Sequence, residues 1–423
     1  MTNRIGIDIG GTFTDLVIEG EKHFKQIGKV LTTPENLVEG VLKAIEISSA
    51  ELDETELFIH GTTVGINSIL ERKGARVALL TTEGFKDVYI IGRGHRPDMF
   101  NLKYQKSLPL LKREDIFEVR ERMNADGQVV EKIDFQFLAS VLNDIKKKGF
   151  EVVAVSLLHS YINPDHELEV RNYFQDHFNS IPIVLSHEVA PEWREYERTS
   201  TTVVSAYITP IVKDYLHRLS KELSDKKLKV PVHITQSNGG SMSSSQASEQ
   251  AVLTLFSGPV GGVVGGKEIG RLINQSNMIC IDMGGTSFDV SLIRNGEVEL
   301  KSEFELQGLP ILAPSVDLVS IALGGGSIVK EVTGGLRVGP ESAGSNPGPA
   351  CYGRGGKMAT ISDANVVLGR LPLEQLLGGN LKLDFKAAHK SVNEVGSRLG
   401  LDTISTAEQA LEVAHFKMSQ AIR

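Results

Sequence analysis

The sequence is poor in cysteine, has no excess of basic residues and contains no long hydrophobic run. Its 423 residues include 2 cysteines, so a disulfide framework is not expected and a reducing compartment fits best. The formal net charge of -8 argues against a sequence-independent nucleic-acid binder, because such proteins need a basic face to displace counterions. No apolar run approaches the ~20 residues of a membrane span, and residues 1–11 do not resemble a signal peptide. We therefore expect a cytoplasmic protein with neither nucleic acid nor membrane as partner.

Several well-known site motifs are also missing. There is no G-x-x-x-x-G-K-[ST] motif, which excludes a P-loop, and no G-x-G-x-x-G before a helix, which argues against a dinucleotide fold. The 11 histidines form no H-E-x-x-H motif, and the cysteines are not closely paired, so a dedicated zinc site is not expected. Cys351 lies in a Gly/Pro-rich loop without an evident histidine partner, so it is not expected to act as a nucleophile.

What the sequence does show is an alternation of strand-like and helix-like segments. This alternation predicts an α/β fold with helices packed on sheet faces, and the opening strand meander predicts mixed sheets. The predicted strands are 4–9, 14–19, 23–30, 56–60, 76–81, 152–158, 182–186, 231–235, 278–282, 287–293 and 316–321. The predicted helices are 34–50, 63–72, 134–148, 164–177, 199–224, 258–274 and 406–422.

The length exceeds what one hydrophobic core usually serves, so we expect two domains, 1–190 and 191–423. The polar, turn-rich segment 93–128 is expected to be an insertion or lid. Glycine is abundant, at 42 residues, and its excess is concentrated in 238–266 and 324–356 and in two repeated turns. Because glycine has no Cβ to obstruct a ligand near the backbone, these loops are candidates for binding.

The repeated turns share the pattern Asp-x-Gly-Gly-Thr-x-x-Asp between apolar strands. The two copies lie 274 residues apart, with Asp8, Gly10, Gly11, Thr12 and Asp15 matched by Asp282, Gly284, Gly285, Thr286 and Asp289. A tight turn of this kind exposes N–H groups and a hydroxyl, which together form an anion-binding concavity. A carboxylate ending the first strand can orient the water shell of Mg²⁺. Two facing turns could thus clamp a triphosphate; the alternative is that each is only a hairpin tip.

These turns resemble the phosphate 1 and phosphate 2 loops of the actin, Hsp70 and sugar-kinase superfamily. The resemblance implies two RNase H-like domains with mixed sheets that close over ATP. Further stretches resemble the hydantoinase A and 5-oxoprolinase family over nearly the whole chain. They are HGTTVGINSILERKGARVALLTTEGF (60–85), RPDMFNL (96–102), SHEVAPEWREYERTSTTVVSAY (186–207), QSNGG (236–240), SGPVGGVVGG (257–266), VGPESAGSNPGPACYGRGG (338–356) and ISDAN (361–365).

The family resemblance implies ATP-dependent ring opening of a cyclic amide such as a hydantoin, 5-oxoproline or another lactam. The resemblance also implies ATP and Mg²⁺ as cofactors and a hydantoinase B-like subunit as partner. The ring would be activated by phosphorylation of its carbonyl oxygen. An ATP-using subunit of an acetone- or acetophenone-type carboxylase is an alternative. Family members usually continue with a Gly-Gly-Ala-Gly-Pro loop, so the second domain is expected to be incomplete, and a truncated nucleotide-binding partner without turnover is a third hypothesis.

The resemblance also suggests roles for individual residues. Asp8 and Asp282 are expected to serve catalysis and Mg²⁺ binding, Thr12 and Thr286 to contact the phosphates, and Asp15 and Asp289 to brace their hairpins. The expected nucleotide-binding set is Gly10, Gly11, Thr12, Thr14, Gly284, Gly285, Thr286, Gly324, Gly325 and Gly326. SGPVGG, before a helix, can present N–H groups to a phosphate or simply allow close packing.

A further set of residues is expected on the substrate side of the cleft. His60, Thr62, Thr63 and Asn67 follow a strand, and Arg93 and Arg96 could clamp a carboxylate or phosphoryl group with their planar guanidinium groups. The alternatives are a buried histidine with an ordinary helix start, and two solvated arginines. In the segment EWREYERTST, Glu192, Glu195 and Arg198 are expected to form charge pairs with a structural role.

Overall fold

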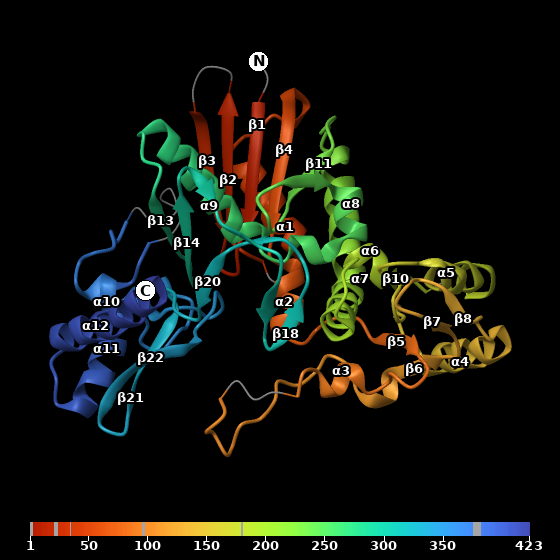
Figure 1. Ribbon diagram of the computed structural model, residues 1–423. Coiled ribbons are helices and arrows are strands. Elements are labelled where there is room, and N and C mark those ends of the chain that lie inside the picture. Colours follow the sequence, from red (N-terminus) through yellow and green to blue (C-terminus); the bar gives the residue numbers. More distant parts are fainter. Residues whose placement is uncertain (1–2, 21–23, 34, 95–97, 179–180, 375–381) are drawn as a thin grey trace.

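The computed structural model describes residues 3–20, 24–33, 35–94, 98–178, 181–374 and 382–423, which form an α/β protein (Figure 1). Its largest sheet has six strands in the order β12-β11-β4-β1-β2-β3. Strands β1 to β3 form an antiparallel meander, and β4 and β11 continue the sheet parallel to β1. The strands are β1 (Asn3–Ile9), β2 (Phe13–Gly20), β3 (Phe24–Leu31), β4 (Thr55–Thr62), β11 (Val232–Thr235) and β12 (Ser241–Ser243).

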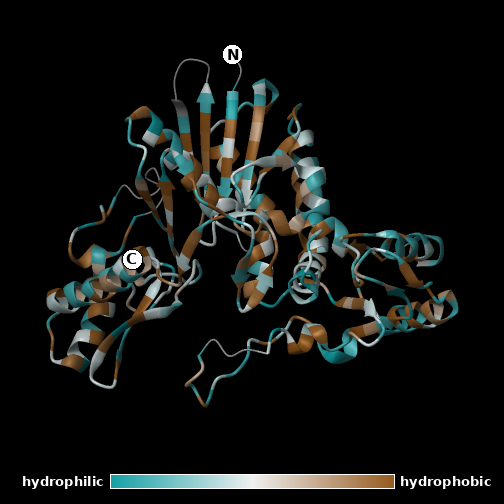
Figure 2. Ribbon diagram, viewed as in Figure 1, coloured by the Kyte–Doolittle hydropathy of each residue, from teal (hydrophilic) through white to brown (hydrophobic). Residues whose placement is uncertain are grey.

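Alternating side chains explain how this sheet is buried. Ile5, Ile7 and Ile9 of β1 are at most 3% exposed, whereas the residues between them point to the other face. Figure 2 shows the same alternation of hydrophobic and polar positions along these strands. The buried face packs into one core with the helices α1 (Leu37–Ile47), α2 (Val64–Leu70) and α7 (Glu195–Asp225).

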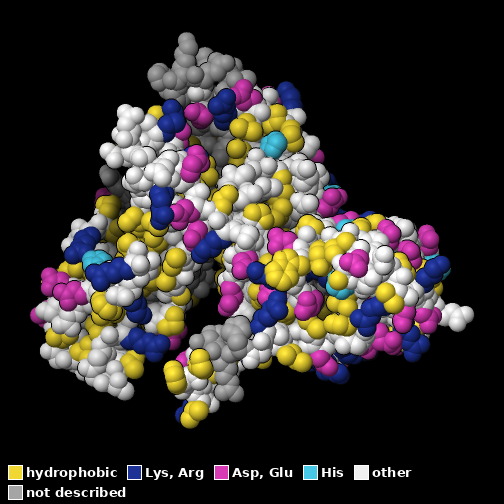
Figure 3. Space-filling view, in the orientation of Figure 1, with side chains coloured by type: hydrophobic (Ala, Val, Ile, Leu, Met, Phe, Trp, Pro, Cys, Tyr) yellow, Lys and Arg dark blue, Asp and Glu magenta, His cyan; other side chains and the backbone are white. Residues whose placement is uncertain are grey.

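A second, all-parallel sheet is inserted between α2 and α7, in the order β10-β9-β5-β6. It comprises β5 (Val77–Thr82), β6 (Ile116–Val119), β9 (Val152–Ser156) and β10 (Ile183–Leu185), with the helices α3 (Val88–Ile91), α4 (Phe135–Lys148) and α5 (Asp165–Phe178). Part of the expected lid, residues 116–119, is therefore the core strand β6. Residues 98–105 belong to a loop that projects at the bottom of Figure 1 and, in the same orientation, of Figure 3, and Lys106 joins its end to the body by donating to the carbonyl oxygens of Ile90 and Ile91.

The second copy of the repeated turn lies in a third sheet, in which β14 pairs with β13, β15 and β20. This sheet contains β13 (Met278–Met283), β14 (Phe288–Arg294), β15 (Glu297–Val298) and β20 (Leu318–Ile321), and is preceded by α9 (Ser257–Leu272). Its core is shared with the hairpin β21 (Ser327–Val332) and β22 (Gly335–Ser342) and with α10 (Ile361–Val367), α11 (Phe385–Leu399) and α12 (Thr403–Ile422).

The mixed α/β class expected from the sequence is confirmed, and each predicted strand and helix coincides with an observed element. The division into domains 1–190 and 191–423 stays a prediction; β11 and β12, which follow residue 190, join the sheet of β1 to β4. Within the described part of the chain, no helix is both long and apolar enough to span a membrane.

A buried histidine links the first sheet to the longest helix. His60 on β4 is 0% exposed; its Nδ1 lies 3.2 Å from the carbonyl oxygen of Ile7, and its Nε2 lies 2.7 Å from the hydroxyl of Tyr215 on α7. Burial lowers the pKa of His60 from 6.5 to about 4, because the apolar core disfavours the charged imidazolium. The neutral ring is therefore part of the folded core.

This burial predicts a pH-dependent loss of stability. Because the folded pKa lies below the unfolded value, the unfolded chain takes up the proton first as the pH falls from 6.5 toward 4. Relative to His60→Gln, the wild type should lose on the order of 3 kcal/mol of unfolding free energy over this window. Denaturant unfolding at several pH values measures the difference, with exposed His177→Gln as a control for the substitution. Parallel curves for the wild type and His60→Gln would contradict the assignment.

Candidate functional site

The two repeated turns adopt the same local structure. The N–H of Gly10 donates to the carbonyl oxygen of Phe13 at 2.8 Å, and the N–H of Gly284 donates to that of Ser287 at 3.0 Å. In the strand register, Asp8 lies opposite Asp15, and Asp282 lies opposite Asp289. Each copy is thus a strand, a tight turn and a second strand, as its sequence predicts.

The fold brings the tips of these two turns together. A Cβ on Gly285 would lie 2.2 Å from the Oγ1 of Thr12, and a Cβ on Gly11 would lie 3.7 Å from the Oγ1 of Thr286. Only glycine at 285 allows this approach, because any side chain there would overlap Thr12. The expectation that the turns face each other is met by this contact.

Asp8 occupies an unusual position beside the first turn. Its Oδ1 is buried and has no hydrogen-bond partner among the described residues. A Cβ on Gly61 would lie 2.5 Å from this oxygen, and one on Gly258 would lie 3.1 Å from it, so glycines on β4 and α9 enclose the carboxylate. A buried, unpaired acceptor of this kind fits a bound cation or a donor on a ligand.

The charges around Asp8 also favour a bound cation. Burial, followed by the negative charges of Asp15 and Asp282, raises the pKa of Asp8 from 3.8 to about 6, and Lys29 partly opposes this shift. The Oγ1 of Thr12 is likewise buried without a partner among the described residues. A site that collects carboxylates without enough positive charge to balance them fits a divalent cation.

The second turn is more open. Asp282 and Thr286 are both exposed, whereas Asp289 is buried, and burial raises its pKa. Asp289 accepts a hydrogen bond from Ser287 at 3.0 Å, and Asp15 in the first copy accepts one from Lys29 at 2.6 Å. These contacts are consistent with the bracing role expected for Asp15 and Asp289.

The glycines at 324–326 form hydrogen bonds with the backbone of the second turn. The N–H of Gly325 donates to the carbonyl oxygen of Gly284 at 3.0 Å, and the N–H of Gly326 donates to that of Gly285 at 2.7 Å. A Cβ on Gly324 would lie 2.5 Å from the backbone nitrogen of Thr286. The structure therefore shows this loop bonded to the backbone of the second turn.

The remaining predicted residues divide between the turns and the core. Thr63 donates to the carbonyl oxygen of Ile9 at 3.1 Å, and Asn67 donates to Thr63, so both lie beside the end of β1. Thr14 is fully buried against Thr32, and Thr62 is buried with its N–H donating to the hydroxyl of Ser257. His60 lies in the core, as described above.

The two arginines expected near the substrate are not both placed. Arg93 pairs with Glu197 at 2.6 Å, near the start of α7, and Arg96 lies outside the described residues. Sequence reasoning overlooked Gly61, which lies beside Asp8, and Lys29, which pairs with Asp15. The stretch SGPVGG, for which phosphate contact or close packing was expected, places Gly258 at the start of α9 and beside Asp8.

A cavity of about 330 Å³ adjoins the second turn, between α9 and the strands β13 and β14. Asp282 and Asp289 line it, together with Cys280 and Ser291. No cluster of three or more His, Cys, Asp or Glu residues that could hold a metal ion occurs within the described ranges. A cation at the turns would therefore depend on few carboxylates and on other oxygen ligands, as Mg²⁺ commonly does.

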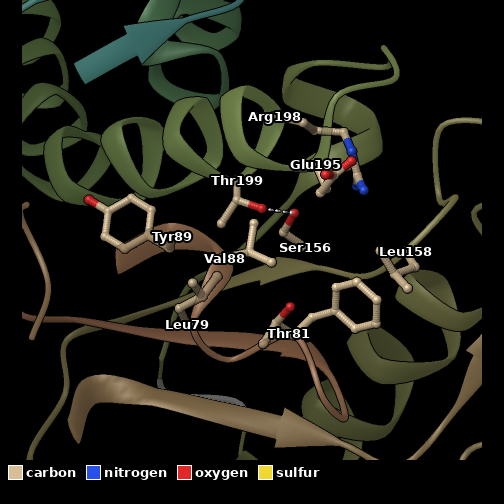
Figure 4. Close-up of a pocket in the computed structure, with 10 residues that line it drawn as sticks. Leu79, Thr81, Val88, Tyr89, Ser156, Leu158, Glu195, Arg198 and Thr199 are labelled. Atoms are coloured by element: carbon tan, nitrogen blue, oxygen red, sulfur yellow. Dashed lines mark hydrogen bonds between the residues drawn. The ribbon is translucent and has the colours of Figure 1, made fainter. Parts of the chain in front are cut away.

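A much smaller cavity, of about 10 Å³, lies between the inserted sheet and α7 (Figure 4). It is lined by Glu195 and Arg198 and by Ser156 and Thr199, which share a 2.8 Å hydrogen bond. Arg198 is buried against Ser160, Ser186 and the carbonyl oxygen of Leu157, with Glu167 at 3.8 Å. This space holds about one water molecule, so the buried Arg198 is structural here.

Known proteins resemble the chain over its whole length. An uncharacterized protein of Methanocaldococcus jannaschii is 39% identical over 100% of this chain and 65% of its own length. Caprolactamase subunit alpha of Pseudomonas jessenii is 32% identical over 99% of this chain and 62% of its own length. The chain thus spans less than two thirds of these relatives.

Solved structures show the same likeness. The nucleotide-free structure of acetone carboxylase matches with a TM-score of 0.85 at 29% identity, over 97% of this chain and 61% of that one. The structure of the ATP-dependent caprolactamase from Pseudomonas jessenii matches with a TM-score of 0.82 at 32% identity, over 99% of this chain and 62% of that one.

Family profiles agree with these matches. The hydantoinase/oxoprolinase N-terminal region matches residues 4–178, and the hydantoinase/oxoprolinase profile matches residues 198–423. Together with the two facing turns, these matches show that the chain belongs to the hydantoinase/oxoprolinase family.

Proposed function

We propose that this chain is the ATP-using component of an enzyme that opens a cyclic amide ring. The observation that carries the proposal is the pair of facing turns, where Asp8 Oδ1 and Thr12 Oγ1 are buried without partners. Such groups suit Mg²⁺ and a polyphosphate, which would bring the missing positive charge and the hydrogen-bond acceptors. The names of the caprolactamase and oxoprolinase relatives support the choice of ring substrate.

The chemistry explains why ATP would be needed. An unstrained lactam is resonance-stabilised, and phosphorylation of its carbonyl oxygen creates a leaving group and an electrophilic carbon. Such a transfer requires mainly positioning and charge neutralisation, which two donor-rich turns can supply. In this proposal Asp8 and Asp282 hold the cation, and Thr12 and Thr286 contact phosphate oxygens. Thr63 and Asn67, beside the end of β1, face the substrate.

We further propose that the first and third sheets are the cores of two RNase H-like halves. The meander β1-β2-β3 with parallel β4 and β11 supports this for the first half, and the matched β13-β14-β20 meander supports it for the second. The protein would act in the cytoplasm together with a hydantoinase B-like subunit. Relatives named as subunits, such as caprolactamase subunit alpha and acetone carboxylase beta subunit, support a heteromer.

A second candidate is the ATP-using subunit of a ketone carboxylase. It is favoured by the TM-score of 0.85 to acetone carboxylase, which exceeds the 0.82 to caprolactamase. The two candidates share the nucleotide site and differ in the molecule that stimulates ATP hydrolysis.

The first prediction concerns the two matched carboxylates. Asp8→Asn and Asp282→Asn should each weaken Mg²⁺-ATP binding about tenfold or more, because each removes a negative charge that would hold the cation. Isothermal titration calorimetry of the 423-residue chain measures this, with exposed Asp126→Asn as the control. Undiminished affinity in both site variants would exclude the proposed cation site. If the wild-type chain binds no Mg²⁺-ATP, the hypothesis of a partner chain without turnover would be favoured instead.

The second prediction concerns the contact between the turns. Gly285→Ala would place a Cβ 2.2 Å from Thr12 Oγ1 and so force the turns apart. We expect Mg²⁺-ATP affinity to fall about tenfold or more while the fold is retained. Gly6→Ala, in β1 before the first turn, is the control, because a Cβ there would meet nothing within 4 Å. Equal affinities for the two variants would show that the spacing of the turns is unimportant.

The third prediction separates the candidate reactions. With the hydantoinase B-like subunit present, ATP hydrolysis should rise when a hydantoin, 5-oxoproline or caprolactam is added, and Asp8→Asn should abolish the rise. Phosphate release measures both. Stimulation by acetone or acetophenone with bicarbonate, and by none of the rings, would replace ring opening with ketone carboxylation.

A further inference from the structure

The cavity beside the second turn has a defined shape. Its floor is one face of the third sheet, where Cys280 lies opposite Ser291, and its roof is the first half of α9. A Cβ on Gly266 of α9 would lie 2.4 Å from the Sγ of Cys280, so helix and sheet are in direct contact there. One turn earlier, a Cβ on Gly262 would meet nothing within 4 Å. The space therefore closes at Gly266 and opens toward the start of α9.

The open end of this cavity adjoins the site between the turns. Pro259 lines the cavity, and a Cβ on the preceding residue, Gly258, would lie 3.1 Å from the Oδ1 of Asp8. Asp282 lines the cavity as well, and its charge contributes, after burial and the charge of Asp15, to the raised pKa of Asp8. A molecule in the cavity would therefore lie next to the place proposed for Mg²⁺ and the polyphosphate.

The size and walls of the cavity suit a small ring. Its volume of about 330 Å³ is near the lower end of the roughly 300–1,000 Å³ found for small-molecule sites. Val263 of α9 and Leu318, which lies opposite Ser291, give it apolar walls. The Oγ of Ser291 is buried, and apart from a weak interaction with the Cys280 thiol it has no hydrogen-bond partner among the described residues. Apolar walls with one unpaired hydroxyl fit a compact ring that carries a single amide.

The charge of the cavity narrows the choice of ring. Asp282 and Asp289 line it, and no Lys, Arg or His is among the described residues that do so. In the first copy of the repeat, the residue opposite Asp15 is Lys29, and the two form an ion pair at 2.6 Å. In the second copy, the residue opposite Asp289 is Ser320. A carboxylate in this cavity would therefore meet negative charge that no lysine balances, and a bound polyphosphate would add to the repulsion.

We propose that this cavity holds the ring of the substrate and selects a neutral cyclic amide over one that carries a carboxylate. The ring packs against Val263 and Leu318, and its N–H donates to the hydroxyl of Ser291. Its carbonyl oxygen faces the open end, where the phosphate would lie. Caprolactam and hydantoin are neutral rings of this kind, whereas 5-oxoproline carries a carboxylate. The ring is a substrate only under the function proposed above.

Protection of Cys280 tests where the ring binds. Cys280 lines the cavity and is partly exposed, whereas Cys351 is buried and serves as an internal control. The probes are 2-pyrrolidinone and 5-oxoproline, which are the same five-membered lactam without and with a carboxylate. Alkylation of the 423-residue chain by N-ethylmaleimide is followed by mass spectrometry, with and without Mg²⁺ and a non-hydrolysable ATP analogue.

The neutral ring should protect Cys280, and the acidic ring should need a concentration about tenfold higher or more for equal protection. Protection by 5-oxoproline at the same or a lower concentration would overturn the proposed selectivity. If 2-pyrrolidinone protects Cys280 in neither condition, the cavity is not the ring site.

Two glycine variants of α9 test whether the ring occupies the cavity itself. Gly262→Leu fills the space without overlapping the protein, because a Cβ there would meet nothing within 4 Å. The affinity for 2-pyrrolidinone, measured by saturation-transfer NMR, should fall about tenfold or more, while the affinity for Mg²⁺-ATP is retained. Gly265→Leu is the matched control, since its Cβ is equally free and the residue does not line the cavity; both affinities should be unchanged.

A third variant removes the hydrogen bond without changing the shape of the cavity. Ser291→Ala should weaken 2-pyrrolidinone binding about fivefold, as expected for the loss of one hydrogen bond. Unchanged ring affinity in both Gly262→Leu and Ser291→Ala would overturn the proposal. Normal Mg²⁺-ATP binding without ring binding would overturn the cavity assignment alone. Ring binding by a chain that binds no Mg²⁺-ATP would support the cavity and contradict the proposed function.

Discussion

The site depends on one close contact, that of Thr12 with Gly285. This contact joins two turns that are 274 residues apart, and it is possible because residue 285 has no side chain. The carbonyl oxygens of both turns accept hydrogen bonds from within the protein: Gly10 and Thr12 from Thr32, and Gly284 and Gly285 from the loop at 324–326. With these acceptors engaged, the turns offer their donor side to a ligand, which favours an anion between them.

The two matched carboxylates differ for a reason that the fold supplies. Asp8 is enclosed by Gly61 of β4 and Gly258 of α9, and its pKa is raised to about 6, chiefly by burial. Asp282 is exposed, and β13, which carries it, has no strand on its outer edge within the described residues. The position that β4 fills beside Asp8 is the position that is open beside Asp282. The two carboxylates thus differ because the first sheet has a strand beside β1 that the third sheet, within the described residues, does not have beside β13.

Much of the fold could be predicted from the sequence, because its helices and strands have clear periods and their ends coincide with turn residues. The facing turns were predictable from the repeat itself. For His60 the sequence left substrate contact and burial both open, because a histidine at a strand end gives no sign of the Tyr215 hydroxyl, 155 residues away, that satisfies it. Nor could sequence reveal that the loop at 324–326 bonds to the second turn. Helix α11 was overlooked, although Ala388, Val392 and Val395 repeat at helical spacing.

The strand β13 shows that an apolar sequence pattern does not by itself determine which side chains are buried. Its apolar residues Ile279, Ile281 and Met283 repeat the pattern of Ile5, Ile7 and Ile9, and the pattern alone predicts burial for both strands. The structure buries the first set and exposes the second. An apolar surface in water costs free energy roughly in proportion to its area, yet the alternation along a strand does not say which neighbouring elements will cover it.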